Sequence, residues 1–453
     1  MKERIRLSEH FTYKKLFRFV LPSVVMMIFT SIYSIVDGFF VSNYTDGLPF
    51  VALNLIFPLI MILGSVGFML GTGGNAIVAK YLGEDKKEKA NKTFSMLVYA
   101  TIIIGIALAL IGIIFAKPIA VLFASTEKEL SVQEKAKLIE YCVVYARIIL
   151  CALPAFMLQN AIQGFFVTAE KPRLGLIVTV VAGCCNIVLD ALLVAVFRWG
   201  LVGAAVATAM SQCVGGILPL FYFGRKNDSL LKLCKTTFKL KIFLKVCGNG
   251  ASELATNISL SIVTIFYNAQ LMKYLGINGV SAYGIMMYIG FIFISIFLGY
   301  AVGCAPIIGF HYGANNRDEL KNIYKKSLQI TAIAGVSMAI FAWVFARPMS
   351  MIFVREETLL NLTVEGLRLY ALSFLVCGFN IFASAFFTAL SNGTVSLIIS
   401  FFRTFVCQIV AVLVLPIFMD KMGIWLASLV AELVSLFATS AFLYFNREKY
   451  GYV

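Results

Sequence analysis

The stretch TFSMLVYATIIIGIALALIGIIF, residues 93 to 115, carries no charged side chain over 23 positions. As an α-helix rising 1.5 Å per residue, a run of this length spans the roughly 30 Å hydrocarbon core of a bilayer. It is too long and too uniformly apolar for a strand of a membrane barrel, which alternates over about 10 residues. Because lipid offers backbone groups no hydrogen-bond partners, a helix is the remaining spanning structure. The stretch therefore predicts a membrane-spanning helix.

The rest of the sequence has the same character. Hydrophobic residues make up 60% of the chain, charged residues 13%, and the mean hydropathy is +0.90. A soluble domain is nearer half apolar and one quarter charged. We therefore predict an all-α polytopic membrane protein with twelve transmembrane helices. The spans lie at about 21–41, 50–79, 93–115, 141–167, 174–197, 201–223, 249–273, 280–309, 327–346, 369–390, 395–418 and 423–445.

The net charge of +15 is concentrated in the connections between these spans. Basic residues gather at both ends of the chain and in the segments 80–92, 225–245 and 317–326. With twelve spans, all of these segments fall on one side, which the positive-inside rule assigns to the cytoplasm. We expect a multi-pass protein of the inner (cytoplasmic) membrane with both termini in the cytoplasm. We do not expect nucleic acid as a partner.

The sequence also repeats itself. FAKPIAVLF at 115–123 matches FARPMSMIF at 345–353, and AIVAKYLGEDKKEKA at 76–90 matches PIIGFHYGANNRDEL at 306–320. Both matches have an offset of 230 residues, which is hard to obtain by chance at two separate places. The matches indicate an internal duplication of a six-helix unit.

An even number of helices in each repeat gives both halves the same orientation in the membrane. We expect two pseudo-symmetric six-helix lobes, residues 1–223 and 248–453, joined by a cytoplasmic linker at 224–247. Repeats of this kind are related by an axis along the membrane normal and enclose a central cavity at mid-depth. The architecture is typical of a transporter, and a duplicated scaffold or channel is the alternative.

Charged residues inside spans are few, and each needs an account. A charge near the middle of a bilayer costs about 2.5–3.5 kcal/mol on insertion scales, so it usually faces the protein interior or water. Asp37 lies deep in the first span, Asn186 and Asp190 share a helical face in the fifth, and Thr208 lies in the sixth.

These four residues offer oxygen ligands, which suit hard cations. Two close carboxylates in a low dielectric must take up a proton or share a cation. We predict a coupling site for H⁺ or Na⁺ at Asp37, Asn186, Asp190 and Thr208, and we expect no other metal and no cofactor. Hydrogen bonding between helices is the structural alternative.

Other polar residues are candidates for the wall of a substrate cavity. In the fourth span, Asn160 and Gln163 lie three residues apart and serve equally well as helix-packing amides. In the seventh span, Glu253 begins a polar stripe that includes Asn257, although a helix dipole would also favour an acid in the first turn.

Glu432, in the last span, has two readings. It could face the cavity, or it could form a salt bridge with Arg403 of the eleventh span. The sequence leaves both readings open.

The sequence lacks the motifs of several other functions. It has no GxxxxGK[ST] phosphate loop and only two histidines, and no soluble segment is long enough to hold an active site. GTGGN at 71–75 lies inside an apolar span, where glycines favour close helix packing over phosphate binding. We therefore predict that the protein is not an enzyme.

Three segments resemble the multidrug and toxic compound extrusion (MATE) family, in its prokaryotic branches. They are LPSVVMMIFTSIYSIVDGFFVSN at 21–43, GTGGNAIVAKYLGE at 71–84 and CAPIIGFHYGANNRDELK at 304–321. The resemblance covers nearly the whole chain and implies twelve helices in two lobes.

The resemblance also implies site residues. It matches Asp37, Asn186, Asp190 and Thr208 to a first-lobe site implicated in Na⁺ or H⁺ coupling. One branch of the family uses acids in the seventh and tenth helices, but the tenth span here contains no acid. We therefore expect coupling in the first lobe.

The function that these observations favour is secondary active multidrug efflux. We expect a monomer that exports cationic or amphiphilic organic compounds in exchange for H⁺ or Na⁺ by alternating access. Its partners would be small organic substrates and membrane lipid. The alternatives are a lipid-linked glycan flippase of the same superfamily, whose cavity should be more cationic, and a non-transporting membrane scaffold or receptor.

Overall fold

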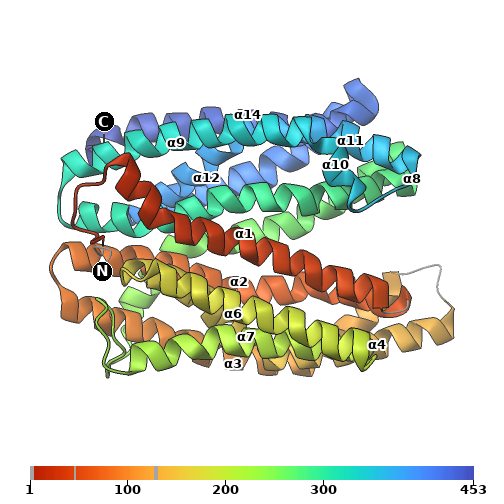
Figure 1. The fold of residues 1–453 in the computed structure, drawn as a ribbon, viewed down its shortest axis with the longest axis horizontal. Helices are drawn as coiled ribbons and strands as arrows, with labels where there is room; N and C mark the ends of the chain where they lie inside the picture. Colours follow the sequence, from red (N-terminus) through yellow and green to blue (C-terminus); the bar gives the residue numbers. More distant parts are fainter. Residues whose placement is uncertain (1–4, 45–46, 127–130, 453) are drawn as a thin grey trace. The chain divides into compact units, whose positions relative to one another are not determined.

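The computed structural model describes residues 5–44, 47–126 and 131–452, and this part of the chain is mostly helical, with no strand (Figure 1). The helices are α1 (Tyr13–Tyr44), α2 (Gly47–Gly83), α3 (Lys87–Thr126), α4 (Val132–Cys151), α5 (Leu153–Thr168), α6 (Pro172–Asp190), the π-helix η1 (Ala191–Val196), α7 (Gly200–Gly224), α8 (Leu240–Gly313), α9 (Arg317–Val344), α10 (Ala346–Met351), α11 (Glu357–Ala371), α12 (Phe374–Ala389), α13 (Gly393–Phe401), the π-helix η2 (Phe402–Cys407) and α14 (Gln408–Tyr450).

The described helices account for twelve membrane crossings. Eight helices or continuous helical segments are long and apolar enough to cross, and the bent pairs α4–α5 and α11–α12 bring this to ten. Two of these segments are broken by residues with positive φ, Gly276 in α8 at 62° and Asp420 in α14 at 47°. Because a right-handed helix cannot continue through such a residue, each break separates two crossings. The predicted all-α membrane fold with twelve spans is confirmed.

Helix ends follow the local chemistry of the chain. Ser131 and Glu134 form a reciprocal capping box at the start of α4, and the Asn316 side chain accepts a hydrogen bond from the first turn of α9. Pro172 occupies the first position of α6, where its missing N–H has no cost. Gly451, with a φ of 65°, ends α14 in the left-handed conformation.

The chain divides into two compact units by its internal packing. Unit 1 comprises residues 1–28, 79–86 and 248–453, and unit 2 comprises residues 29–78 and 87–247. The lobe and linker boundaries drawn from the sequence stay a prediction.

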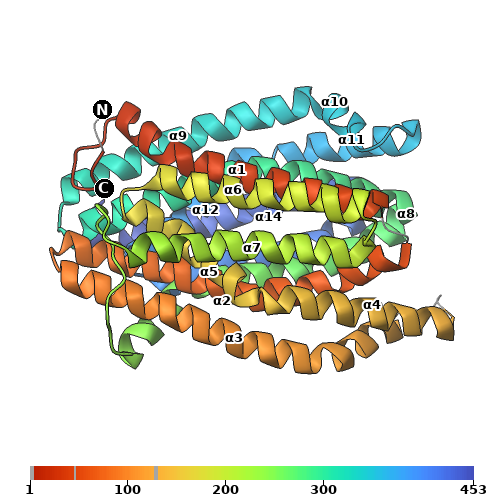
Figure 2. The same ribbon diagram turned by 60° about the horizontal axis from the view of Figure 1, so that its bottom comes forward.

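Unit 1 is organised around α12, which packs against α9, α13 and α14. Its core contains Trp425, Phe374 and Leu367, each at most 2% exposed. In unit 2, α3 packs against α4 and α5, and α7 packs against α5 and α6 (Figure 2).

Glycines bring α2 and α5 of unit 2 into close contact. Gly67 and Gly71 lie one turn apart on α2, and a Cβ on either would lie 2.6 Å from the Cα of Met157 or Ala161 in α5. Small residues at this spacing let two membrane helices approach closely. The interpretation of GTGGN as a helix-packing segment is confirmed at Gly71.

Substitution by alanine should have opposite effects on stability at Gly71, which lies in this contact, and at Gly284, which lies in open space. We expect Gly71→Ala to destabilise the protein by about 1–3 kcal/mol, because the new methyl group meets the Ala161 backbone, which cannot move aside. Gly284 in α8 has no atom within 4 Å of its Cβ position, so Gly284→Ala should be neutral or stabilise the helix by up to about 1 kcal/mol. Thermal unfolding of the two variants in detergent tests this prediction, and equal shifts would contradict it.

The internal repeat is preserved in the backbone. Within the described residues, six non-glycine residues have positive φ, a conformation that such residues seldom adopt. They form three pairs in the two halves of the chain, at offsets of 230, 221 and 222 residues. The pairs are Asp85 and Asn315, Glu170 and Ser391, and Arg198 and Asp420. The predicted duplication is therefore visible in local conformation as well as in sequence.

Candidate functional site

The four predicted first-half residues come together inside unit 2. Asp37 lies on α1, Asn186 and Asp190 lie on α6, and Thr208 lies on α7, which packs along α6 (Figure 1). Oγ1 of Thr208 donates a hydrogen bond to Oδ1 of Asp37 at 3.4 Å. The Asp37 carboxyl group also interacts with the side chains of Asp190 and Asn186. Their role in coupling stays a prediction.

The interior of this cluster is short of positive charge. Asp190 is 0% exposed and Asn186 is 2% exposed. Among the described residues, neither carboxylate oxygen of Asp190 has a hydrogen-bond partner, and the Asn186 amide nitrogen has none either. The charged neighbour of Asp190 is Asp37, which as a carboxylate can only accept hydrogen bonds. An unpaired buried charge is costly, so a proton or a cation between the two acids would satisfy both.

A glycine allows α1 to lie close to α6 at this depth. A Cβ on Gly183 would lie 2.5 Å from the Phe29 ring and 2.9 Å from the Tyr33 ring. Asp190 is the last residue before the π-helix η1, and such segments occur often at functional sites. The local fold therefore carries the two α6 side chains toward α1.

Three further residues of this region, Tyr33, Tyr145 and Gln159, were not predicted from the sequence. The Tyr33 hydroxyl interacts with the side chain of Gln159 and with the charge of Asp37, and Tyr145 of α4 is close enough to interact with both acids. Tyr33 lies four residues before Asp37, so their shared helical face could have identified it. Tyr145 and Gln159 lie on α4 and α5, far from Asp37 in the sequence, and no spacing pattern relates them to it.

The fourth-span candidates lie on α5. The amide nitrogen of Asn160 is buried without a hydrogen-bond partner in the described part of the chain, and Gln163 is buried. No contact found among the described residues joins either of them to Asp37 or Asp190. Their part in a cavity stays a prediction.

Glu432 forms a salt bridge, one of the two readings that the sequence left open. Nε of Arg403 donates to both carboxylate oxygens, at 2.8 and 3.0 Å. The Asn380 amide donates to Oε2 of Glu432 at 2.7 Å and to its main-chain oxygen at 3.0 Å. The side chains of Arg403 and Glu432 are 15% and 6% exposed. This cluster in unit 1 is thus neutral and largely satisfied.

The seventh-span candidates lie in the first part of α8. Glu253 is half-buried and within electrostatic reach of Arg403. The Asn257 amide donates to the main-chain oxygen of Glu253 at 2.8 Å, and Ser261 donates to that of Asn257 at 3.2 Å. The polar stripe therefore bonds largely to its own helix. A role for Glu253 or Asn257 in substrate contact stays a prediction.

Comparisons with known proteins place this geometry in context. The sequence model of the MatE family matches residues 22–192 and 254–414. The chain is 24% identical to "Multidrug export protein MepA" of Staphylococcus haemolyticus, over 78% of this chain and 74% of that protein. It is 22% identical to the protein of the same name from Staphylococcus saprophyticus, over 96% and 94% of the two chains. The structure is similar to that described as "Crystal structure of MATE in complex with MaL6", with a TM-score of 0.90, 21% identity and full coverage of both chains.

Proposed function

This chain belongs to the MatE family, whose members are multi-pass membrane transporters and not enzymes, and on that premise we propose that it is a secondary active multidrug exporter. Its substrates would be cationic or amphiphilic organic compounds, exchanged for H⁺ or Na⁺. The names of the similar staphylococcal proteins support export of this kind. We further propose a monomer in the cytoplasmic membrane with both termini in the cytoplasm and no cofactor.

One observation carries the proposal for the coupling ion. Asp37 and Asp190 approach each other from two helices, and the buried oxygens of Asp190 have no hydrogen-bond donor in the described part of the chain. A site of this composition gains free energy when a proton or small cation enters. It has no comparable attraction for an anion.

The free energy of ion binding at this site can drive alternating access. When the site faces outward, Asp37 and Asp190 take up H⁺ or Na⁺, which removes the repulsion between them and changes the packing of α1 against α6. Substrate binding from the opposite side favours release of the ion. Coupling requires only that ion and substrate differ in their affinity for the two states.

The charge distribution argues against a lipid-linked glycan flippase. A pyrophosphate group would need positive charge within the membrane. Arg403, the intramembrane cation that the sequence pointed to, is already paired with Glu432. The acidic cluster around Asp37 would repel such a substrate.

Transport by the purified protein tests the proposal. We expect proteoliposomes containing the full chain to move a cationic dye such as ethidium against its gradient when either a proton or a sodium gradient is imposed. Each gradient is applied alone, with an ionophore that collapses it as the control. Transport of a radiolabelled lipid-linked sugar with no dye movement would instead support the flippase, and the absence of both would support a scaffold.

A further inference from the structure

The segment before α1 is docked on the start of α9, within unit 1 (Figure 2). The side chains of Leu7 and Phe11 are both 0% exposed, although residues 5–12 form no helix or strand. The Phe11 ring packs edge-on against the ring of His311 at the end of α8, with 6.4 Å between the ring centres. Residues 7–11, the N-terminal strap, therefore belong to the packed interior of unit 1.

Side chains of α9 bind the main chain of the strap. The Phe11 N–H donates to Oε1 of Glu319 at 2.9 Å. The Phe11 carbonyl oxygen accepts from the Asn322 amide at 3.1 Å and from Nζ of Lys326 at 2.6 Å. Nδ1 of His10 lies 2.6 Å from Oε2 of Glu319. Glu319 lies in the first turn of α9, where the helix dipole favours its negative charge, so α9 presents a stabilised acceptor to the strap.

The strap fixes one end of a helix that the two units share. Residues 13–28 of α1 belong to unit 1, and residues 29–44, which include Asp37, belong to unit 2. Within unit 1, α1 packs closely on α8, since a Cβ on Gly299 would lie 2.5 Å from the Cα of Val24. Because the strap ends two residues before α1, the start of the helix can leave α9 only when the bonds of the strap break.

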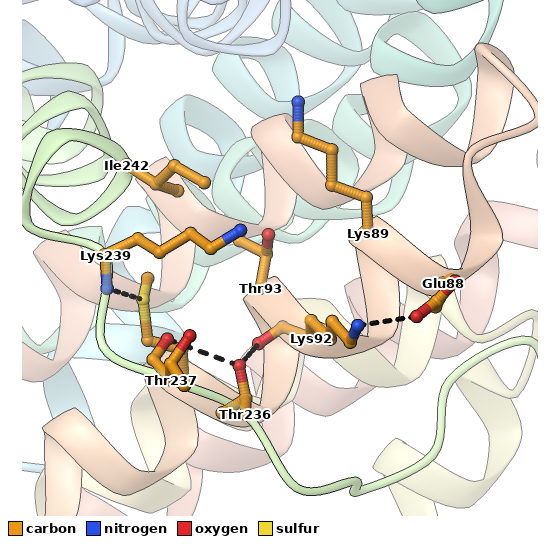
Figure 3. Close-up of a pocket in the computed structure, with 9 residues that line it drawn as sticks. Glu88, Lys89, Lys92, Thr93, Thr236, Thr237, Lys239 and Ile242 are labelled. Carbon is orange, nitrogen blue, oxygen red and sulfur yellow. Dashed lines mark hydrogen bonds and ion pairs between the residues drawn. The ribbon is translucent and has the colours of Figure 1, made fainter.

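The second half of the chain has a similarly docked segment. Residues 240–247 of α8 belong to unit 2 and the rest of α8 to unit 1, and the segment before it, residues 231–239, is bonded to the start of α3 (Figure 3). The contacts are Lys232 N to Asn91 Oδ1 at 2.7 Å, Cys234 N to Ser95 Oγ at 2.9 Å, Thr236 Oγ1 to Lys92 O at 3.0 Å and Lys239 N to Met96 Sδ at 3.3 Å. α3 begins at Lys87 and α9 at Arg317, at the 230-residue offset of the internal repeat. Both halves have therefore kept the docking, although the bonding side chains differ.

We propose that the N-terminal strap is a latch that must open for α1 to move during transport, and that Glu319 is the residue that positions it. The closed strap holds the start of α1 on α9, and the open strap leaves the helix that carries Asp37 restrained by its packing alone. The bonds suit repeated opening, because water can replace them and the His10 side chain is 65% exposed. The inference rests on the proposed function, since it assigns a step of the transport cycle to this segment.

Hydrogen exchange of the full-length protein in detergent tests the latch itself. Glu319→Ala removes a charged acceptor from the Phe11 N–H, and a bond of this kind favours the closed state by about 10- to 100-fold. We expect peptides that contain Phe11 to exchange faster by that factor and peptides from α12 to exchange as before. Asn446→Ala, which removes an amide bonded within α14 of the same unit, is the matched control and should leave exchange at Phe11 unchanged. Unchanged exchange at Phe11 in Glu319→Ala, or equal acceleration in α12, would contradict a latch that opens locally.

A reversible cross-link tests whether transport needs the latch to open. His10→Cys with Glu319→Cys is made in a chain whose ten native cysteines are replaced by alanine or serine, and the two thiols are joined by a bifunctional methanethiosulfonate. We expect the cross-linked protein in proteoliposomes to lose most of its ethidium transport and to regain it when dithiothreitol cleaves the link. Each single-cysteine protein takes up the same reagent without a cross-link and should keep its transport.

The outcomes separate the latch from the transport function. Full transport by the cross-linked protein would overturn the proposal, because α1 would then work with its start fixed. Equal loss in the single-cysteine proteins would also count against it, since modification rather than locking would be the cause. Absence of transport from the reduced protein and from the unmodified chain alike would instead refute the proposed function, on which the hydrogen-exchange result does not depend.

Discussion

Asp190→Asn should abolish ion-driven export while leaving the protein folded. A charge moving across 100 mV supplies about 2.3 kcal/mol, which corresponds to a substrate concentration ratio of about 50. If the acids of unit 2 carry that charge, the variant should lose up to this factor in dye accumulation at steady state. Asp37→Asn should have the same effect, because the two carboxyl groups share one site. Dye uptake into inside-out proteoliposomes under an imposed gradient measures it.

The stability of the same variant separates coupling from structural bonding. Asp190 has no hydrogen-bond donor to lose among the residues that the structure describes, and an asparagine amide there could donate to Asp37. We therefore expect the unfolding temperature of Asp190→Asn to stay the same or to rise. Asp420→Asn, at the exposed break in α14, is the matched control and should change neither transport nor stability. Undiminished export by Asp190→Asn would exclude our site, and a large fall in its unfolding temperature would favour the structural role.

The second large effect concerns Arg403 and Glu432. Removing one member of a buried ion pair typically costs about 3–5 kcal/mol, because the other charge is left uncompensated. Glu432→Gln and Arg403→Met should each lower the unfolding temperature by several degrees. The double variant Arg403→Met with Glu432→Leu should recover most of the loss, because two apolar side chains replace both charges.

A double-mutant cycle measures this coupling in detergent. The interaction free energy between the two positions should exceed about 1 kcal/mol, which separates contacting residues from independent ones. Asn380 retains a hydrogen bond to the main-chain oxygen of residue 432, so its amide does not become an orphan in the double variant. Additive losses would show that the pair contributes no stability as a unit.

Much of the fold could be predicted because lipid restricts the choices. Apolar runs of about 20 residues in a membrane must be helices, so the number of spans could be predicted from the hydropathy pattern along the chain alone. Details that depend on packing did not follow. The 51° bend between α11 and α12 and the π-helices η1 and η2 have no pattern in the sequence that marks them, whereas the 50° bend between α4 and α5 lies beside Pro154, at the start of α5.

Some residues of the candidate site could likewise be predicted from the sequence, and others could not. Asp37 and Asp190 stood out because charges are rare in spans, and Asn186 followed from its helical spacing to Asp190. Tyr145 of α4 did not stand out, since tyrosine is common in membrane helices and its closeness to the acids arises from tertiary packing. The sequence suggested Arg403 as a partner for Glu432, but only the structure shows that the two side chains are in contact.

The paired positive-φ residues align the two halves of the chain position by position, although the side chains at the paired positions differ. Glu170 and Ser391, and Arg198 and Asp420, bracket the fifth helix of each half with offsets of 221 and 222 residues. The counterpart of Asp190 is then Ala411 or Val412, both buried and apolar. Since their common ancestor, one copy has kept or acquired an acid where the other has a hydrocarbon side chain. The two copies have diverged in chemistry while holding their turns fixed, so an ion pathway engineered into the second copy would have to begin with a carboxylate at 411 or 412.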